Sequence, residues 1–298
     1  MPDIKIGTRP SRLAMKQADM VYRRMVEAGM EAKIVPVTSS GDVDTETPLY
    51  QSKGTGIFSN EINKMVMKGE LDAAVHSAKD LPSLLPDGMA ILVPIPRDSF
   101  HDAFVSSFTI EAIMPGANIG TSSLRRIREL AMIRSDLSAK DIRGNIDTRI
   151  RKLQEGYYDG IILAEAGLNR MNVDISYERL DVKNFMPAPN QGIIAVTIRK
   201  DSDFFSIMEH LIDRESQNAM EIERSIMRTL NLGCSVPAGI LARRTGASWT
   251  VDVRLHSLTN REFMDFSSRV SGADDAADYA RQIMADLPVR YGYKYGEA

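Results

Sequence analysis

The sequence is poor in several chemically distinctive residues: its 298 positions include one cysteine, one tryptophan and four histidines. A single cysteine, Cys234, excludes an internal disulfide framework and favours a reducing compartment. The formal net charge of −3 argues against general nucleic-acid binding, because such proteins are usually basic overall. We therefore expect a protein whose substrate or ligand is a small molecule, with no nucleic-acid partner.

Long apolar runs are also missing. No stretch approaches the roughly 20 apolar residues that span a bilayer. The N-terminus begins on the strand-like sequence Asp3–Gly7 and lacks a basic segment followed by an apolar one. We expect a cytoplasmic protein with no membrane partner. A length of 298 residues indicates two or three domains.

The first 37 residues show a strand, helix, strand pattern. A strand at 4–6 leads past Arg9 to Ser11, a good helix N-cap, and apolar residues then recur at helical spacing until Gly29. Residues 32–37 form the next strand. This β-α-β opening predicts a parallel sheet with ligands at the carboxyl ends of its strands.

The predicted strand 71–75 runs directly into His76, Ser77, Lys79 and Asp80. This could be a solvated loop, and His76 alone is more often a structural histidine than a base. Asp80 differs because Pro82 limits helix continuation after it. A carboxylate fixed there could stabilise a cation or exchange protons with it.

Residues 38–56 form a long polar loop, which includes Lys53 and Thr55 and precedes a helix that carries Phe58. It is either a surface excursion or a lid over an anion site. The loop lacks the spacing of a Walker A motif.

Arginines concentrate at two predicted helix starts, Gly120–Arg126 and Arg143–Arg149. Backbone N–H groups, hydroxyls and guanidinium groups at such places bind anions. The stripe Leu124, Ile127 and Leu130 places Arg125 and Arg126 off the core face. The alternative is a solvated helix face.

Two chain crossings are predicted. Pro94 and Pro96 precede a new strand at 103–105, and the strand 193–198 returns to the first sheet. A helix over 218–232 then ends at Gly233, followed by Cys234. A lone cysteine in an apolar stretch favours a core position, whereas the surrounding turn residues favour a modifiable one. Three strands and a helix over 273–285 complete a small α+β domain.

Eight short motifs follow one another along the chain: Thr8–Ser11, Gly41–Val43, His76–Pro82, Asp102–Ser106, Gly120–Arg126, Arg143–Arg149, Ile161–Arg170 and Gly233–Pro237. Together, and in this order, they resemble the porphobilinogen deaminase (hydroxymethylbilane synthase) family. The resemblance implies an α/β protein with two periplasmic-binding-protein-like domains flanking a cleft, plus a small C-terminal α+β domain with a three-stranded antiparallel sheet. The implied domains are residues 1–95 with 193–212, residues 99–188, and residues 214–298.

The resemblance also implies an activity. Enzymes of this family condense four porphobilinogen units head to tail, with loss of ammonia, on a dipyrromethane cofactor, then release hydroxymethylbilane by hydrolysis. By resemblance, Cys234 carries the dipyrromethane in a thioether and Asp80 is catalytic, facing a cationic azafulvene. The implied substrate is porphobilinogen, and we expect a monomer without a metal site.

Binding roles follow from the same resemblance. The residues expected to bind carboxylates of cofactor or substrate are Arg9, Ser11, Ser77, Lys79, Thr121, Ser122, Ser123, Arg125, Arg126, Arg143, Gly144, Asn145, Arg149, Arg170 and Gln191. Lys53 and Thr55 belong to the implied lid, and Phe58 could stack on a pyrrole ring.

The chain departs from the family pattern at a few places. Thr55 stands at the lid's usual lysine, Asp147 at a small residue, Glu165 at an apolar one and Asn190 at a glycine. Two other classes of function fit the sequence less well. A non-catalytic solute-binding protein leaves Cys234 and Asp80 without a role. An RNA- or phosphate-binding module predicts aromatic residues among the arginines, and these are almost absent there.

Overall fold

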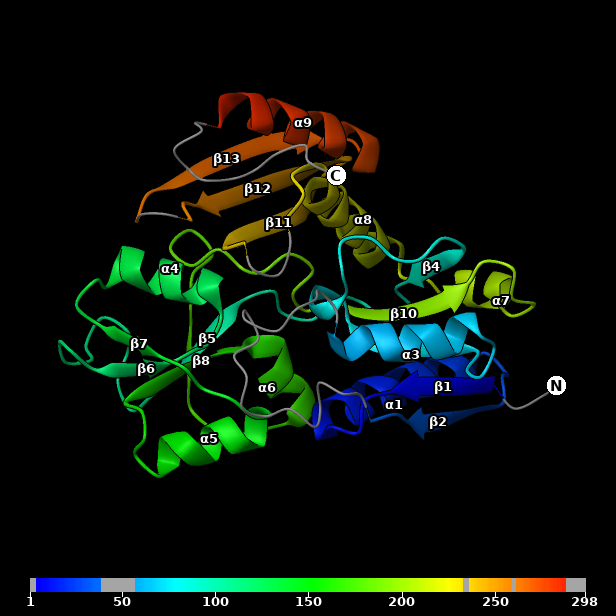
Figure 1. Ribbon diagram of the computed structural model, residues 1–298, viewed down its shortest axis with the longest axis horizontal. Coiled ribbons are helices and arrows are strands. Elements are labelled where there is room, and N and C mark those ends of the chain that lie inside the picture. The colour runs from blue at the N-terminus through cyan, green and yellow to red at the C-terminus, as the bar shows by residue number, and fades with distance from the viewer. Residues whose placement is uncertain (1–3, 39–56, 233–235, 259–260, 288–298) are drawn as a thin grey trace.

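A computed structural model describes residues 4–38, 57–232, 236–258 and 261–287, without the side chains of residues 57 and 58. The chain forms three parts, each built on its own sheet (Figure 1). We name them the first α/β unit, the second α/β unit and the third unit. In Figure 1 they occupy the lower right, the left and the top.

The first α/β unit has a five-stranded sheet in the order β2-β1-β3-β10-β4. β1, β2 and β3 are parallel, and β10 runs antiparallel between β3 and β4. Helices α1 and α3 pack apolar residues on opposite faces of the sheet. The elements are β1 (Ile4–Thr8), α1 (Arg12–Glu27), β2 (Ala32–Pro36), α3 (Ile57–Met67), β3 (Ala73–Ser77), β4 (Met89–Leu92), β10 (Ile194–Arg199) and α7 (Phe205–Glu209).

The second α/β unit repeats this plan with the order β7-β6-β8-β5-β9. β6, β7 and β8 are parallel, and β5 runs antiparallel between β8 and β9. Helices α4 and α5 pack on opposite faces. The elements are β5 (Asp102–Val105), β6 (Asn118–Gly120), α4 (Leu124–Ile133), β7 (Ser138–Lys140), α5 (Ile146–Gln154), β8 (Gly160–Ala164), α6 (Glu165–Met171) and β9 (Glu178–Arg179).

The antiparallel strand of each sheet comes from a chain crossing. β5 follows the first crossing, whereas β10 follows the second crossing and returns to the first sheet. The predicted return of 193–198 is therefore confirmed. Two connections join the α/β units, and both lie close to the third unit (Figure 1).

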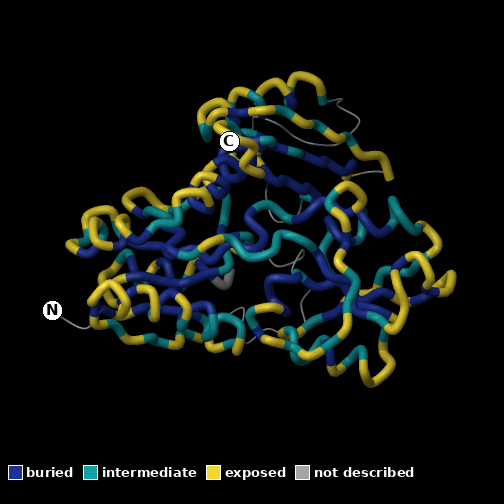
Figure 2. Tube along the Cα trace, turned by 180° about the vertical axis from the view of Figure 1, so that it is seen from behind, coloured by how far each residue is buried: buried dark blue, intermediate teal, exposed yellow. Residues whose placement is uncertain are grey.

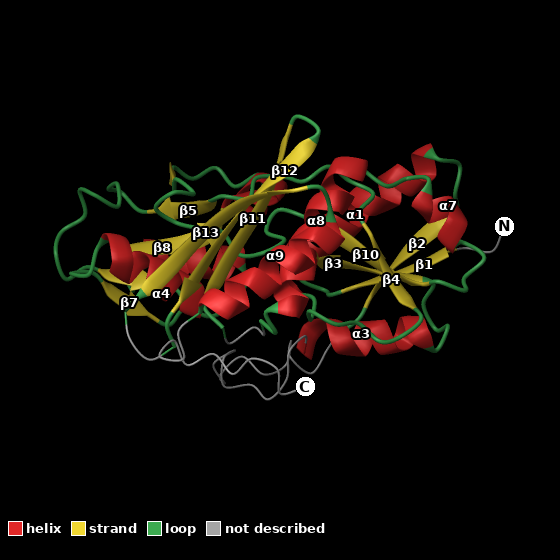
Figure 3. Cartoon of the chain, turned by 90° about the horizontal axis from the view of Figure 1, so that it is seen from above, coloured by secondary structure: helices red, strands yellow, loops and turns green. Residues whose placement is uncertain are grey.

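The third unit consists of a three-stranded antiparallel sheet with two helices on one side. Figure 3 shows α8 and α9 beside this sheet. Its elements are α8 (Arg214–Thr229), β11 (Ala238–Thr245), β12 (Ser248–His256), β13 (Phe263–Val270) and α9 (Ala273–Asp286). Its core joins Ile222 and Ile226 of α8 to Val251 and Val253 of β12.

This architecture confirms the predicted fold class: two α/β units of like strand order and a small antiparallel α+β unit. Buried chain runs through the middle of each unit, and exposed chain lies at its rim (Figure 2). The domain limits 1–95 with 193–212, 99–188 and 214–298 stay our proposal. No helix among the described residues is long and apolar enough to cross a membrane.

Candidate functional site

Asp80 stands at the carboxyl edge of the first sheet. β3 ends at Ser77, and a short 3-10 turn, Ala78–Asp80, carries the aspartate out of the sheet. Its side chain is exposed, and no hydrogen bond or ion pair engages the carboxylate among the described residues. It shares a small pocket with residues from the loop between β1 and α1 and from α1, α3 and β3, namely Arg9, Ser11, Leu13, Ala14, Gln17, Ser59, Val75, His76 and Ser77. The predicted position at a ligand edge fits this geometry.

His76 lies on the inner side of the same pocket as a structural residue. Its ring is buried, and Nε2 lies 3.1 Å from Oδ1 of Asn63. Burial lowers the pKa of His76 to about 4, and the charge of Arg9 adds to this. The imidazole is neutral at pH 7, in agreement with the structural role that the sequence favoured.

Ser11 and Ser77 hold the pocket wall in place. The Ser11 hydroxyl caps α1 by accepting from the backbone N–H of Ala14, as predicted. Nε2 of the buried Gln17 lies 2.9 Å from the Ser77 hydroxyl. Arg9 lines the pocket between them. These side chains are placed where small anionic or polar groups could be bound.

Lys79 points from the first α/β unit toward the connection between the units. Its ammonium donates to Oε1 of Gln191 at 3.3 Å. Burial lowers the pKa of Lys79 to about 8, the arginines Arg126 and Arg125 lower it further, and Asp80 and Asp102 oppose them. A pKa of about 8 means that Lys79 loses part of its charge as the pH rises just above neutral.

The prediction that Arg125 and Arg126 lie off the core face is wrong. They are 5% and 7% exposed, because both guanidinium groups bind the fully buried carboxylate of Asp102. Nη2 of Arg125 lies 2.7 Å from Oδ2, and Nη2 of Arg126 lies 2.7 Å from Oδ1. A charged side chain can replace an apolar one on a core face when a buried counter-ion meets it.

Asp102 is the site residue that sequence reasoning missed. It begins β5 with its side chain 0% exposed. Burial alone would raise its pKa, but Arg125 and Arg126 outweigh burial and hold the pKa well below the usual range. The sequence feature that could have revealed it is an aspartate at the start of an apolar strand, because a charged side chain in a buried strand requires a partner of opposite charge.

The hydroxyls before α4 serve the backbone. Ser123 caps α4, accepting from the N–H of Arg126, and the buried Thr121 hydroxyl accepts from the N–H of Ser123 at 3.3 Å. Ser122 bonds both the N–H and the carbonyl of Ile142 at 3.0 Å, which fixes the start of the next arginine segment. Their predicted role in ligand binding stays a prediction.

Arg143 and Arg149 have unused donors. The Nη2 atom of Arg143 is buried, and its guanidinium group has no hydrogen-bond partner among the described residues. Arg149 uses only Nε, which donates to the carbonyl of Gly144 at 2.8 Å. Burial lowers the pKa of Arg149 to about 10, Arg126 and Arg143 add to this, and Asp80 opposes it. The field of Asp80 thus reaches arginines of the second α/β unit.

Gly144 and Asn145 shape this second arginine segment. Gly144 adopts a φ of +107°, where a Cβ would also lie within 2.6 Å of Thr148. Asn145 caps α5 by accepting from the N–H of Thr148 at 3.0 Å. The turn directs the Gly144 carbonyl to Arg149, so both residues position an arginine.

Arg170 and Gln191 meet at the second crossing. Arg170 lies 3.4 Å from Asp98 and donates to the carbonyl of Gly192. Gln191 is fully buried, and its amide nitrogen donates to the carbonyls of Phe100 and His101 and to Asp102. Both side chains join the crossing segments, and direct ligand binding by either stays a prediction.

Four predicted residues lie partly or wholly outside the described part of the chain. Lys53, Thr55 and Cys234 lie outside it, and for Phe58 only the backbone, in α3, is described. Lys53 and Thr55 belong to the predicted lid over 39–56, which lies outside it in full.

The three family departures that the structure describes each have partners. Asp147 of α5 lies 3.2 Å from Arg12 of α1, across the two α/β units. Glu165 is 1% exposed and binds Ser99, Tyr177 and Arg179. Asn190 has a φ of +60°, in the region that glycine favours and asparagine tolerates.

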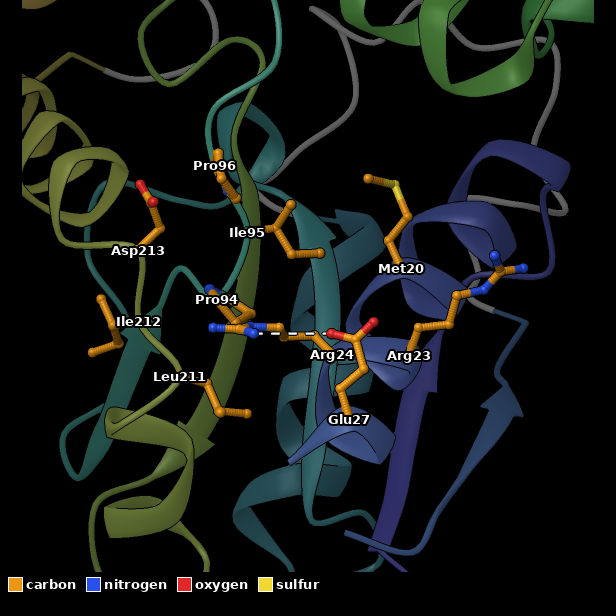
Figure 4. A pocket seen from close by; sticks show the side chains of 10 residues that line it. All are labelled: Met20, Arg23, Arg24, Glu27, Pro94, Ile95, Pro96, Leu211, Ile212 and Asp213. Atoms are coloured by element: carbon orange, nitrogen blue, oxygen red, sulfur yellow. Dashed lines mark ion pairs between the residues drawn. The ribbon is translucent and has the colours of Figure 1, made fainter. Parts of the chain in front are cut away.

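A second and larger cavity, about 520 Å³, lies elsewhere in the first α/β unit. Figure 4 shows Met20 and Arg24 of α1 on one wall, with Ile95 and Leu211 from two other segments opposite. The Arg24–Glu27 ion pair, at 3.9 Å, is within it. This cavity contains none of the predicted site residues.

Comparison with known proteins places the chain. The family profile described as "Porphobilinogen deaminase, dipyromethane cofactor binding domain" matches residues 4–206. The chain belongs to the porphobilinogen deaminase family. It is 41% identical to a probable porphobilinogen deaminase of Thermoplasma volcanium over 97% of this chain and 98% of that one. It is 42% identical to that of Picrophilus torridus, over 97% and 99%.

The family places the chain among transferases of tetrapyrrole biosynthesis, and the matched segment is the family's dipyrromethane-binding part. A methionine-binding protein shares 12% identity over 72% of this chain and 94% of that one at a TM-score of 0.44, too distant to carry an argument.

The described residues fit a dipyrromethane. Such a group carries several carboxylates, and it needs cationic donors that are not already paired. Arg143 has a buried Nη2 atom without a partner, and Arg149 has two terminal nitrogens without one among the described residues. Asp102 and Asp98 already pair with the other arginines, namely Arg125, Arg126 and Arg170.

Proposed function

We propose that the protein is a hydroxymethylbilane synthase: it condenses four porphobilinogen units head to tail with loss of ammonia and then releases the linear tetrapyrrole hydroxymethylbilane by hydrolysis. The dipyrromethane would be linked to Cys234, where it supplies a nucleophilic pyrrole carbon as primer. The observation that carries the proposal is the exposed carboxylate of Asp80, unpaired among the described residues, which shares a pocket with Arg9 and Ser11 at the carboxyl edge of the first sheet. The family supports the same reading.

Asp80 would act on the reacting porphobilinogen. Loss of ammonia leaves positive charge on the substrate, and a carboxylate held near it stabilises that charge. The 3-10 turn holds Asp80 at the sheet edge, and no partner among the described residues neutralises it. The same carboxylate can accept the proton released when the new carbon–carbon bond forms.

Substrate and primer carboxylates would be bound on the opposite side. Arg143 and Arg149 offer guanidinium donors that match carboxylate geometry. Arg9, Ser11 and Ser77 line the Asp80 pocket and would orient the substrate there. In this arrangement Arg125 and Arg126 supply positive field while Asp102 holds them. A monomer in the cytoplasm and a closing lid over 39–56 stay predictions.

The intact mass of the purified protein tests the proposal. A covalent primer adds the mass of two linked pyrrole units, and Cys234→Ser removes that increment together with turnover. Cys234 is the only cysteine, so no other thiol can take its place. The control is Ser257→Ala, which leaves the thiol intact. An unmodified wild-type mass, or an increment that persists in Cys234→Ser, contradicts the proposal.

A further inference from the structure

A chain of polar contacts, partly buried at Lys79 and buried at Asp102, joins Lys79 to the arginine pair of the other α/β unit. Lys79 donates to Oε1 of Gln191 at 3.3 Å, and Nε2 of Gln191 donates to Oδ1 of Asp102 at 3.1 Å. The same carboxylate binds Arg125 and Arg126. The contacts pass through the second crossing, so they connect the 3-10 turn after β3 with β5 and α4 at the place where the two units meet.

The charges of this cluster are unequal. Lys79, Arg125 and Arg126 are cations, and Asp102 is the anion among them that all three reach directly or through Gln191. Asp80 also faces Lys79 and favours its charged form. Arginine does not lose its proton near neutral pH, whereas a buried lysine does. If the cluster loses negative charge, Lys79 is therefore the cation that loses its proton more readily.

We propose that Asp102 and Gln191 are positioning residues that keep the Lys79 ammonium charged and directed beside Asp80, so that Lys79 can bind a ligand carboxylate. Asp102 offsets the repulsion of the two arginines. Gln191 accepts a hydrogen bond that the charged ammonium donates more strongly than the neutral amine would. The carboxylate-binding role of Lys79 rests on the proposed function, but its charge state does not.

The titration of Lys79 already reflects these opposing groups. Its pKa is lowered to about 8, first by burial and then by Arg126 and Arg125, against the opposing charges of Asp80 and Asp102. An opposite charge nearby favours the charged form of a group, and so does a hydrogen bond that the charged form donates. Removing either support should move the titration midpoint of Lys79 to lower pH.

Competitive labelling with acetic anhydride over a series of pH values measures this midpoint, with Lys79 acetylation read by peptide mass spectrometry. We expect a wild-type midpoint near 8. Asp102→Asn should lower it by about 1 pH unit, and Gln191→Met should lower it less. Asp136→Asn is the matched control, because Asp136 pairs with Arg134 at the surface of the same unit. Its midpoint should equal the wild-type one.

A midpoint in Asp102→Asn equal to the wild-type value overturns the proposal. If Asp102→Asn does not fold, by circular dichroism, Gln191→Met decides, since it leaves the Asp102–arginine pairs intact; an unchanged midpoint there overturns the proposal as well. The labelling needs no turnover, so failure of the proposed function leaves this readout in place. Where turnover is present, the alkaline limb of its pH profile should move to lower pH in Asp102→Asn and not in Asp136→Asn.

Discussion

Nη1 of Arg97 lies 2.6 Å from Oε1 of Glu223, although the two residues are 126 positions apart. Arg97 belongs to the first crossing and Glu223 to α8 of the third unit. The same carboxylate, 0% exposed, accepts from the backbone N–H groups of Asn190 in the second crossing and Ala242 in β11. One buried glutamate therefore ties both connections between the α/β units to the third unit.

Glu223→Gln should destabilise the fold strongly. The substitution leaves the Arg97 guanidinium, which is 11% exposed, without its counter-ion. We expect the free energy of unfolding in urea to fall by about 3 kcal/mol. Arg151→Gln is the control, because Arg151 and Glu155 form an exposed pair at 3.8 Å that should contribute less than about 1 kcal/mol. Equal losses in the two variants would contradict a structural role for the buried pair.

Asp80→Asn should abolish turnover while the fold persists. Asp80 is exposed and unpaired among the described residues, so its replacement by the isosteric amide removes charge without removing a contact. Porphobilinogen consumption and ammonia release should both fall at least about 100-fold. Asp87→Asn changes another exposed aspartate seven residues on and should be near wild type. Turnover of Asp80→Asn within a few-fold of wild type would remove Asp80 from the proposed mechanism.

Arg143→Gln should weaken ligand binding more than it weakens the fold. The buried Nη2 of Arg143 has no partner among the described residues, so none of them loses a hydrogen bond to that atom when the guanidinium group is removed. We expect KM for porphobilinogen to rise by about tenfold, the loss of one charge-assisted contact, or dipyrromethane occupancy to fall in the intact mass. Arg151→Gln again serves as the control. Unchanged KM and unchanged occupancy would show that Arg143 faces no ligand carboxylate.

His76 should make the fold acid-sensitive. Its pKa is lowered from 6.5 to about 4 in the folded state, so the unfolded chain binds a proton that the folded chain does not between these values. The stability that the neutral ring contributes is complete above pH 6.5 and is lost as the pH falls toward 4. The full effect is about 3 kcal/mol.

Urea unfolding at several pH values measures this loss. The slope of unfolding free energy against pH between 6.5 and 4 should decrease in His76→Gln, by up to the contribution of one proton. His210→Gln, which alters an exposed histidine, should keep the wild-type slope. A wild-type slope in His76→Gln would mean that the acid sensitivity comes from other groups, such as the carboxylate of Asp102.

The sequence by itself determined most of the local elements. Apolar periodicity placed α1, α8 and the three strands of the third unit, and Ser11 was recognisable as an N-cap. Short elements such as β7 and α7, of three and five residues, span too few positions to show a periodicity. Asp80 was singled out because it follows a buried strand and stands two residues before Pro82, and its catalytic role stays a prediction.

Only the tertiary structure decided which arginines are paired. Arg125, Arg126, Arg143 and Arg149 look alike in sequence, since each stands at a helix start beside small polar residues. Asp102 meets the first two because β5 inserts next to β8, beneath α4, and no local pattern encodes that neighbour. The fold likewise brings Gln191 of the second crossing and Glu223 of α8 to the junction of the units. Pairing of buried charges depends on residues far apart in the chain, which is why the fold, and not the motif, divides the arginines into those held by the protein and those with donors left over.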